Sequence, residues 1–146
     1  MYDIIFVCTG NTCRSPMAEA LAAKMMPALS FSSMGVAANS GSPASINACK
    51  AMEIEGLDIS CHRSKMVDHE LLLDAKLVLT MTKLHLFIVK SFCKSVNAFT
   101  LGEYAGSGKD IIDPFGGDLE IYQECAKELK ALIAICAEKF QKPSLV

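Results

Sequence analysis

The chain has 146 residues, which is long enough for a buried core, and we expect residues 1–146 to form one domain. Its net charge is −2 and its basic residues form no run, so we expect no nucleic-acid partner. The apolar run at residues 4–7 is too short for a signal peptide, and no segment approaches the roughly 18 apolar residues of a spanning helix, so we expect a cytoplasmic protein without a membrane partner.

Short apolar runs alternate along the chain with longer amphipathic stretches. In chain order they predict a strand at residues 3–7, a helix at 16–26, a strand at 29–36, helices at 43–55 and 68–74, a strand at 76–81, a helix at 83–92, a strand at 98–101 and a helix at 118–140. Strands that alternate with helices are typical of parallel sheets with helices on both faces. The predicted fold is therefore α/β: a single-domain three-layer sandwich around a four-stranded parallel sheet.

The segment CTGNTCRS at residues 8–15 follows the first predicted strand, and ligands of such sheets bind beyond the carboxyl ends of strands. Gly10 and Asn11 tolerate left-handed backbone angles, so residues 9–13 can curl into a nest of inward N–H groups that binds an anion. Pro16 suits the first turn of a helix, whose positive end adds to the nest. Arg14 can grip two oxygens of a tetrahedral oxyanion. We predict a phosphate-binding loop.

Cys8 lies at the rim of this positive loop. Such surroundings favour the thiolate, which is the nucleophilic form of cysteine. The hydroxyl of Ser15 is close enough in sequence to hydrogen-bond the Cys8 sulfur and to help it depart as a leaving group. A buried cysteine that merely ends a strand is the alternative, but Gly-Asn, Arg and Ser-Pro at these offsets favour a nucleophile.

A reaction through phosphocysteine also needs a proton donor and then a base that activates water. Asp113, in the stretch IIDPFGG, lies in the loop after the fourth predicted strand and can reach the same edge of the sheet. The alternative for Asp113 is a turn-forming residue before proline. Ser33 in SSMG and His62 in CHRS are weaker candidates, since each is also compatible with an ordinary polar residue of the core or surface.

Seven cysteines are present, but their number is odd, their spacing is irregular and no C-x-x-C occurs. We therefore expect neither a disulfide framework nor a metal site. Cys13 has two open interpretations: a small packing residue, or a resolving thiol that captures an oxidised Cys8 as a disulfide. For the other five we expect structural roles, with Cys125 and Cys136 on the core face of the last helix; the five are Cys49, Cys61, Cys93, Cys125 and Cys136.

Over nearly its whole length the chain resembles the low-molecular-weight protein tyrosine phosphatases. The resemblance rests on VCTGNTCRSP at 7–16, SSMGV at 32–36, H-x-S at 62–64, VLTM at 78–81 and DPF at 113–115. It implies no metal or other cofactor, phosphorylated proteins as substrates and inorganic phosphate as a product. It also implies residue roles: Cys8 as nucleophile, Arg14 as phosphate clamp, Asp113 as acid and base, and Ser33 and His62 as supporting residues. The implied phosphate-binding residues are Thr9, Gly10, Asn11, Thr12, Cys13, Arg14 and Ser15.

Two positions resemble the bacterial protein-arginine phosphatases of this family more than its tyrosine-specific members. Thr12 stands where the latter usually carry a bulky aliphatic residue, and Phe115 is followed by two glycines rather than by a second aromatic. A threonine hydroxyl can accept a hydrogen bond from the N–H groups of a phosphorylated guanidinium, which an aliphatic side chain would leave unpaired. We therefore expect phosphoarginine to be the substrate, with Thr12 and Phe115 setting specificity.

Three alternatives remain. The first is a phosphatase acting on phosphotyrosine, with Thr12 an ordinary loop residue. The second is an arsenate reductase, which would need two further cysteines on a mobile segment; only Cys93 lies in a suitable region. The third is a binding module that recognises phosphoproteins without hydrolysing their phosphate. We would expect such a module to lack Cys8 or Asp113.

Overall fold

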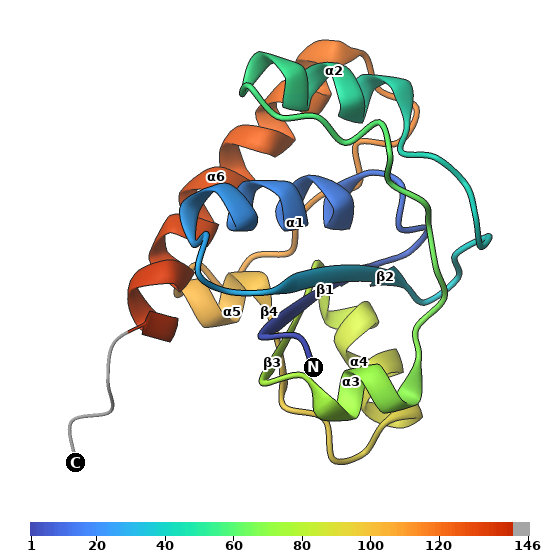
Figure 1. The fold of residues 1–146 in the computed structure, drawn as a ribbon, viewed down its shortest axis with the longest axis vertical. Coiled ribbons are helices and arrows are strands. Elements are labelled where there is room, and N and C mark those ends of the chain that lie inside the picture. The colour runs from blue at the N-terminus through green and yellow to red at the C-terminus, as the bar shows by residue number, and fades with distance from the viewer. Residues whose placement is uncertain (142–146) are drawn as a thin grey trace.

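The computed structural model describes residues 1–141, and residues 142–146 of the predicted domain lie outside this part. Four parallel strands form one sheet in the order β2-β1-β3-β4 (Figure 1). The strands are β1 (Ile4–Cys8), β2 (Phe31–Gly35), β3 (Leu77–Thr80) and β4 (Ala98–Thr100). The predicted fold class is therefore confirmed.

Helices cover both faces of the sheet (Figure 1). Their bounds are α1 (Arg14–Met25), α2 (Ile46–Ile54), α3 (His69–Asp74), α4 (Lys83–Phe92), α5 (Leu101–Ala105) and α6 (Leu119–Gln141). The helices α1, α2, α5 and α6 share one hydrophobic core with one face of the sheet, and α3 and α4 share a second core with the other face. Within residues 1–141, no helix combines the length and the apolar character needed to cross a membrane.

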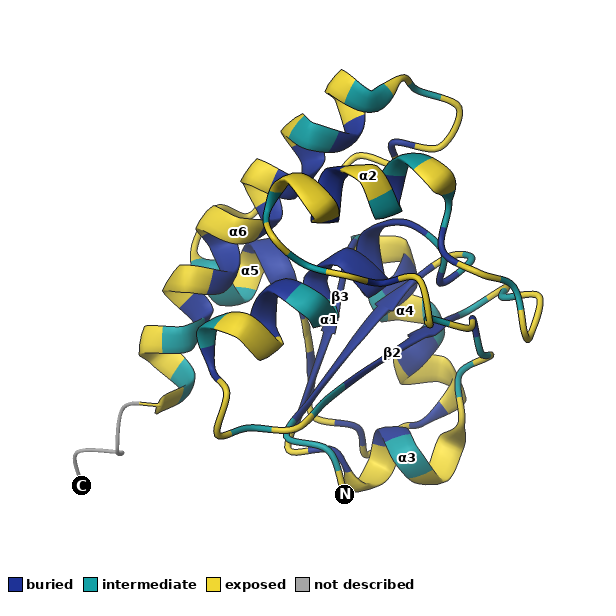
Figure 2. Ribbon diagram, turned by 45° about the horizontal axis from the view of Figure 1, so that its top comes forward, coloured by how far each residue is buried: buried dark blue, intermediate teal, exposed yellow. Residues whose placement is uncertain are grey.

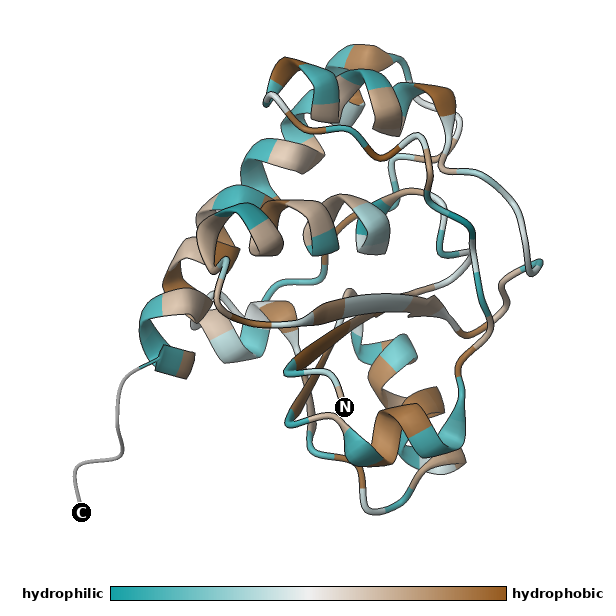
Figure 3. Cartoon of the chain, viewed as in Figure 1, coloured by the Kyte–Doolittle hydropathy of each residue, from teal (hydrophilic) through white to brown (hydrophobic). Residues whose placement is uncertain are grey.

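The two central strands, β1 and β3, are buried on both faces, as parallel strands between helix layers must be. Along β1, Ile4 and Phe6 point into the α1–α6 core, while Ile5 and Val7 point into the α3–α4 core, and all four side chains are inaccessible to solvent. Figure 2 shows these buried strands against the exposed outer faces of the helices, and Figure 3 shows β1 and β3 as hydrophobic ribbons beside the paler β2. Each fully buried large aliphatic side chain contributes about 1.5–3 kcal/mol, so β1 is anchored firmly.

Two element boundaries differ from the prediction in ways that matter for the loop at residues 8–15. Strand β1 continues through Cys8 instead of ending at residue 7, because the carbonyl of Cys8 still accepts a hydrogen bond from Val36 N at 3.0 Å. Helix α1 begins at Arg14, two residues before the predicted start, so Pro16 lies within its first turn. The turn tolerates proline because the first amides of a helix lack partners inside it.

The short helix α5 was not predicted, and the predicted strand at 98–101 ends at Thr100. Thr100 caps α5 through its side chain, and Gly106 ends the helix with a φ of 88°. Gly102 lies inside this helix and weakens its signal in the sequence, since glycine is a poor helix former. The glycine is required because a Cβ there would collide with the backbone oxygen of Lys109.

Of the five cysteines for which we expect structural roles, four are buried or half-buried. Cys93, Cys125 and Cys136 are buried, and burial raises the pKa of the Cys125 thiol to about 12 and that of Cys136 to about 11. Cys49 is half-buried. The expectation of a packing role is wrong for Cys61, which is exposed on the loop that follows α2.

Candidate active site

Asn11 organises the loop at residues 8–15. Its φ of 57° lies in the left-handed region, and its side chain is fully buried. The side-chain amide donates to the hydroxyls of Ser15 and Ser33 at 2.8 and 2.9 Å, and its oxygen accepts from Lys65 N at 3.0 Å. The carbonyl of Asn11 lies 2.7 Å from Nε2 of His62. These contacts outweigh the small conformational cost of a left-handed asparagine and fix the curl of the loop.

Gly35 lets β2 approach this loop closely. A Cβ at that position would lie 2.5 Å from the carbonyl oxygen of Thr9 and 2.9 Å from the amide nitrogen of Asn11. Any side chain at position 35 would therefore push the loop away from the sheet. Sequence reasoning quoted SSMGV as a motif but assigned this glycine no role.

Cys8 presents its sulfur at the floor of a pocket while the residue as a whole is almost completely buried. Its Sγ lies 2.9 Å from the hydroxyl oxygen of Ser15. Because that oxygen already accepts a hydrogen bond from Asn11, the hydroxyl proton is free to be donated to the sulfur. The arrangement places a hydroxyl donor directly beside the Cys8 sulfur.

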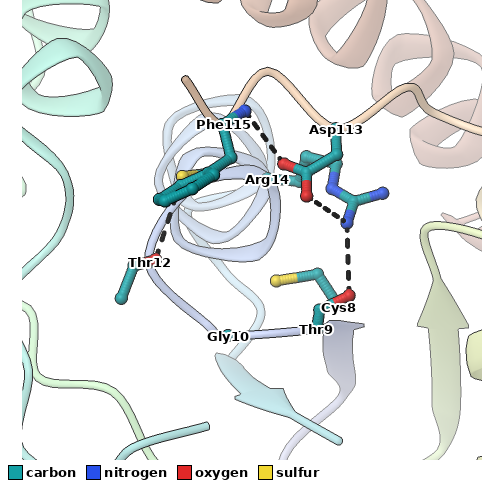
Figure 4. Close-up of a pocket in the computed structure, with 8 residues that line it drawn as sticks. Cys8, Thr9, Gly10, Thr12, Arg14, Asp113 and Phe115 are labelled. Carbon is teal, nitrogen blue, oxygen red and sulfur yellow. Dashed lines mark hydrogen bonds and ion pairs between the residues drawn. The ribbon is translucent and has the colours of Figure 1, made fainter. Parts of the chain in front are cut away.

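Arg14 reaches the same pocket from the first turn of α1, and its side chain is buried. One terminal nitrogen, Nη1, donates to the carbonyl of Ile111 at 2.8 Å. The other, Nη2, lies 3.5 Å from Oγ1 of Thr9 and 3.6 Å from Oδ2 of Asp113 (Figure 4). The guanidinium is thus held at the pocket, with Nη2 beside the polar side chains of Thr9 and Asp113 that line it.

Within residues 1–141, no side-chain cap is found at the N-terminus of α1. Cys13 is the N-cap and makes no capping hydrogen bond, whereas Ser45, Thr82 and Thr100 cap α2, α4 and α5 through their hydroxyls. Free amides at the positive end of a helix, together with the Arg14 guanidinium, form an anion-binding arrangement.

Asp113 and Phe115 form the opposite wall. Oδ1 of Asp113 accepts a hydrogen bond from Phe115 N at 3.0 Å, and half of the carboxylate side chain is exposed. The Phe115 ring is exposed beside the pocket mouth (Figure 4). The pocket has a volume of about 240 Å³, and its lining residues are Cys8, Thr9, Gly10, Thr12, Cys13, Arg14, Asp113 and Phe115.

The four other residues predicted for the site contribute from behind the pocket. Asn11, Ser15, Ser33 and His62 do not line it, but they form the hydrogen-bond network that supports the loop. In the part of the chain that the structure describes, no three His, Cys, Asp or Glu side chains lie close enough together to hold a metal ion.

Comparison with protein families places this loop and fold among known proteins. Residues 3–144 match the model of the low molecular weight phosphotyrosine protein phosphatases. The chain belongs to that family.

Its relatives include both arginine and tyrosine phosphatases. A protein-arginine-phosphatase of Geobacillus stearothermophilus is 44% identical over 144 residues, which cover 96% of this chain and 97% of the relative. A low molecular weight protein-tyrosine-phosphatase, PtpB, of Staphylococcus epidermidis is 37% identical over 131 residues, covering 89% and 93%. The solved structure of a YwlE arginine phosphatase mutant with a phosphorylated active-site serine superposes with a TM-score of 0.90 at 39% identity, covering 97% of both chains.

In this member of the family, sequence reasoning missed His85. The residue belongs to the first turn of α4, is buried, and places Nε2 2.8 Å from Oγ1 of Thr9. Burial, followed by the positive charge of Arg14, lowers the pKa of His85 to about 4, although Asp110 and Asp113 act in the opposite direction. A signal was available, because His85 follows β3 at the same edge of the sheet as the phosphate-binding loop.

Tyr122 on α6 was missed as well. Its hydroxyl lies 3.3 Å from Sγ of Cys13, which also lies 3.5 Å from the Ser45 hydroxyl. Burial and then the contact with Cys13 raise the pKa of Tyr122 to about 12. The phenol therefore stays neutral and packs behind the loop.

Proposed function

We propose that the protein is a cysteine-dependent protein phosphatase that hydrolyses phosphoarginine through a phosphocysteine intermediate. The observation that carries this proposal is the pocket itself. Cys8, with the Ser15 hydroxyl at 2.9 Å, faces the same space as Arg14 and the half-exposed carboxyl of Asp113. Nucleophile, phosphate clamp and acid thus share one pocket.

In the first step, the Cys8 thiolate attacks phosphorus in line with the leaving group. A phosphorus–sulfur bond forms and the phosphorus–nitrogen bond breaks, while the carboxylic acid of Asp113 gives its proton to the departing guanidine nitrogen. Arg14 and the amides of residues 9–15 stabilise the negative charge on the phosphoryl oxygens. The leaving group needs this proton, because guanidine is a stronger base than the phenolate that phosphotyrosine would release.

In the second step, the Asp113 carboxylate takes a proton from water, which attacks phosphorus and displaces the sulfur. Inorganic phosphate is the product, and the Ser15 hydroxyl stabilises the departing thiolate. The phosphorylated active-site serine in the mutant of the YwlE arginine phosphatase supports a covalent phosphoenzyme in this family.

Thr12 supports phosphoarginine as the substrate. Its half-buried side chain lines the pocket, where its hydroxyl oxygen can accept a hydrogen bond from a guanidinium N–H. The 44% identity to a protein-arginine-phosphatase also supports phosphoarginine as the substrate.

Phosphotyrosine is the second candidate, and a specific residue favours it. The exposed ring of Phe115 beside the mouth can stack against an aryl group, and the relative from Staphylococcus epidermidis is named a tyrosine phosphatase.

Thr12→Val decides between the two substrates, because it removes the hydroxyl with little change of shape. The values of kcat/KM are measured on phosphoarginine and phosphotyrosine peptides of the same flanking sequence, with Cys8→Ser as the inactive blank. The loss of one hydrogen bond should lower the preference for phosphoarginine about tenfold. If the preference does not change, Thr12 does not set the substrate.

Cys13 has a proposed role as a resolving thiol. When peroxide oxidises the Cys8 thiolate to a sulfenic acid, the Cys13 thiol displaces water and forms a disulfide that a dithiol reductant reopens. With Cys13→Ser, peroxide treatment should cause a loss of activity that the reductant no longer restores, because the sulfenic acid is oxidised further. Equal recovery of both proteins would leave Cys13 with a packing role.

A further inference from the structure

A second series of hydrogen bonds reaches the pocket from α4, which lies on the opposite face of the sheet from α1. Nε2 of His85 lies 2.8 Å from Oγ1 of Thr9, and Nη2 of Arg14 lies 3.5 Å from the same oxygen. His85 is 3% exposed, so its ring is fixed by the surrounding chain. Thr9 lines the pocket beside Cys8 (Figure 4).

The position of the proton on His85 decides what the Thr9 hydroxyl can do. A neutral imidazole carries one proton, on either Nδ1 or Nε2. Nδ1 is buried and makes no hydrogen bond within residues 1–141. A proton on Nδ1 would leave a buried donor unpaired, whereas a proton on Nε2 is used in the contact with Thr9. The geometry therefore favours the Nε2–H form, in which His85 donates and Thr9 accepts.

A hydroxyl group has two lone pairs and one proton. Arg14 can only donate, so its contact occupies one lone pair of the Thr9 oxygen, and His85 in its Nε2–H form occupies the other. The hydroxyl proton is then committed to neither neighbour. Since Thr9 borders the pocket, this proton is available to a group bound there.

We propose that the Thr9 hydroxyl donates a hydrogen bond to the phosphoryl group in the pocket, and that His85 is the positioning residue that keeps this proton free. The inference rests on the proposed phosphatase function and extends it, because the loop then contributes a side-chain donor in addition to its amides and Arg14. The donor acts on the phosphoryl group and not on the leaving group. Its contribution should therefore be the same for phosphoarginine and phosphotyrosine.

The test compares five variants: Thr9→Val, Thr9→Ser, His85→Leu, His85→Gln and the double variant Thr9→Val/His85→Leu. Glutamine can present an amide N–H near the place of Nε2, so it serves as the conservative replacement. His69→Leu, an exposed histidine on α3, is the matched control for loss of an imidazole. Thermal unfolding confirms that each variant is folded, and the readouts are kcat/KM on both peptides and the affinity for inorganic phosphate by calorimetry.

Thr9→Val is expected to lower kcat/KM about 10- to 100-fold on both peptides, and to weaken phosphate binding, because one hydrogen bond to a charged group is lost. Thr9→Ser and His85→Gln should recover most of the loss seen in Thr9→Val and His85→Leu, respectively. The double variant should be no worse than Thr9→Val alone, since His85 acts only through the Thr9 hydroxyl.

Three results would overturn the inference. A hydrogen bond from the Thr9 hydroxyl to the phosphoryl group is excluded if Thr9→Val retains phosphate affinity and activity. The positioning role of His85 is excluded if the effects of Thr9→Val and His85→Leu multiply in the double variant, or if His85→Gln is as impaired as His85→Leu. A wild-type protein that binds phosphate but turns over neither peptide refutes the proposed function instead, and the calorimetry on Thr9→Val still tests the donor.

Discussion

Gly35→Ala tests how closely β2 and the phosphate-binding loop must pack. The new Cβ would lie 2.5 Å from the carbonyl oxygen of Thr9, whereas ordinary contacts begin at 3.4 Å. Strand and loop must therefore separate by about 0.9 Å. The neighbouring atoms of Thr9 and Asn11 belong to the backbone, so no change of rotamer relieves the collision.

Two effects of different size follow from this displacement. Overpacking costs about 1–3 kcal/mol, and about 1 kcal/mol lowers the Tm of a chain of this length by roughly 2–4 °C. The Tm of Gly35→Ala should thus fall by roughly 2–12 °C, with the protein still folded at room temperature. A displacement of about 1 Å among groups that position a substrate can cost about 100-fold in rate, so kcat/KM should fall by about that factor.

The assay measures kcat/KM on a phosphoarginine peptide together with Tm by calorimetry. Gly41→Ala is the matched control, because Gly41 has a φ of 90° and open space around its Cβ position. It should lose stability from backbone strain and keep its activity. The packing argument fails if Gly35→Ala stays within threefold of the wild type, or if Gly41→Ala loses as much activity.

Three further predictions follow from the site. Ser15→Ala removes the hydroxyl 2.9 Å from the Cys8 sulfur and should slow both steps, so that kcat falls at least tenfold; an unchanged kcat would mean that the thiolate needs no such donor. Asp113→Ala should reduce turnover of phosphoarginine more than that of an activated aryl phosphate, which leaves without a proton; equal losses contradict the role of Asp113 as acid. The pKa of His85 in the fold, about 4, lies below its ordinary 6.5, so the unfolded chain binds more protons between these values. The free energy of unfolding should therefore decrease as the pH falls from about 6.5 to 4, and His85→Gln should flatten this slope in denaturant titrations; an equal slope in the variant excludes His85 as its source.

The phosphate-binding loop was predictable because its chemistry is local. Cys8, Arg14 and Ser15 lie within eight residues of sequence, and Gly-Asn with Ser-Pro indicates how the chain between them must curl. Asp113 is distant in sequence, but parallel strands bring their carboxyl ends to one edge of a sheet, so it too could be assigned to the site.

The missed residues act through partners that no local pattern indicates. His85 contacts a residue 76 positions earlier, and Tyr122 contacts one 109 positions earlier. Within their amphipathic helices both fit the periodicity of ordinary core positions. Gly35 in β2 is needed only because the loop packs on it, and that distance exists only in the folded chain.

The most direct test of the proposed function is the ratio of kcat/KM values for a phosphoarginine peptide and a phosphotyrosine peptide with identical flanking residues, measured with wild-type protein and with Cys8→Ser as the blank. The account predicts release of inorganic phosphate that depends on Cys8, with phosphoarginine preferred by about 100-fold or more. A preference for phosphotyrosine would contradict the assigned substrate, and phosphate release by Cys8→Ser at the wild-type rate would contradict the mechanism.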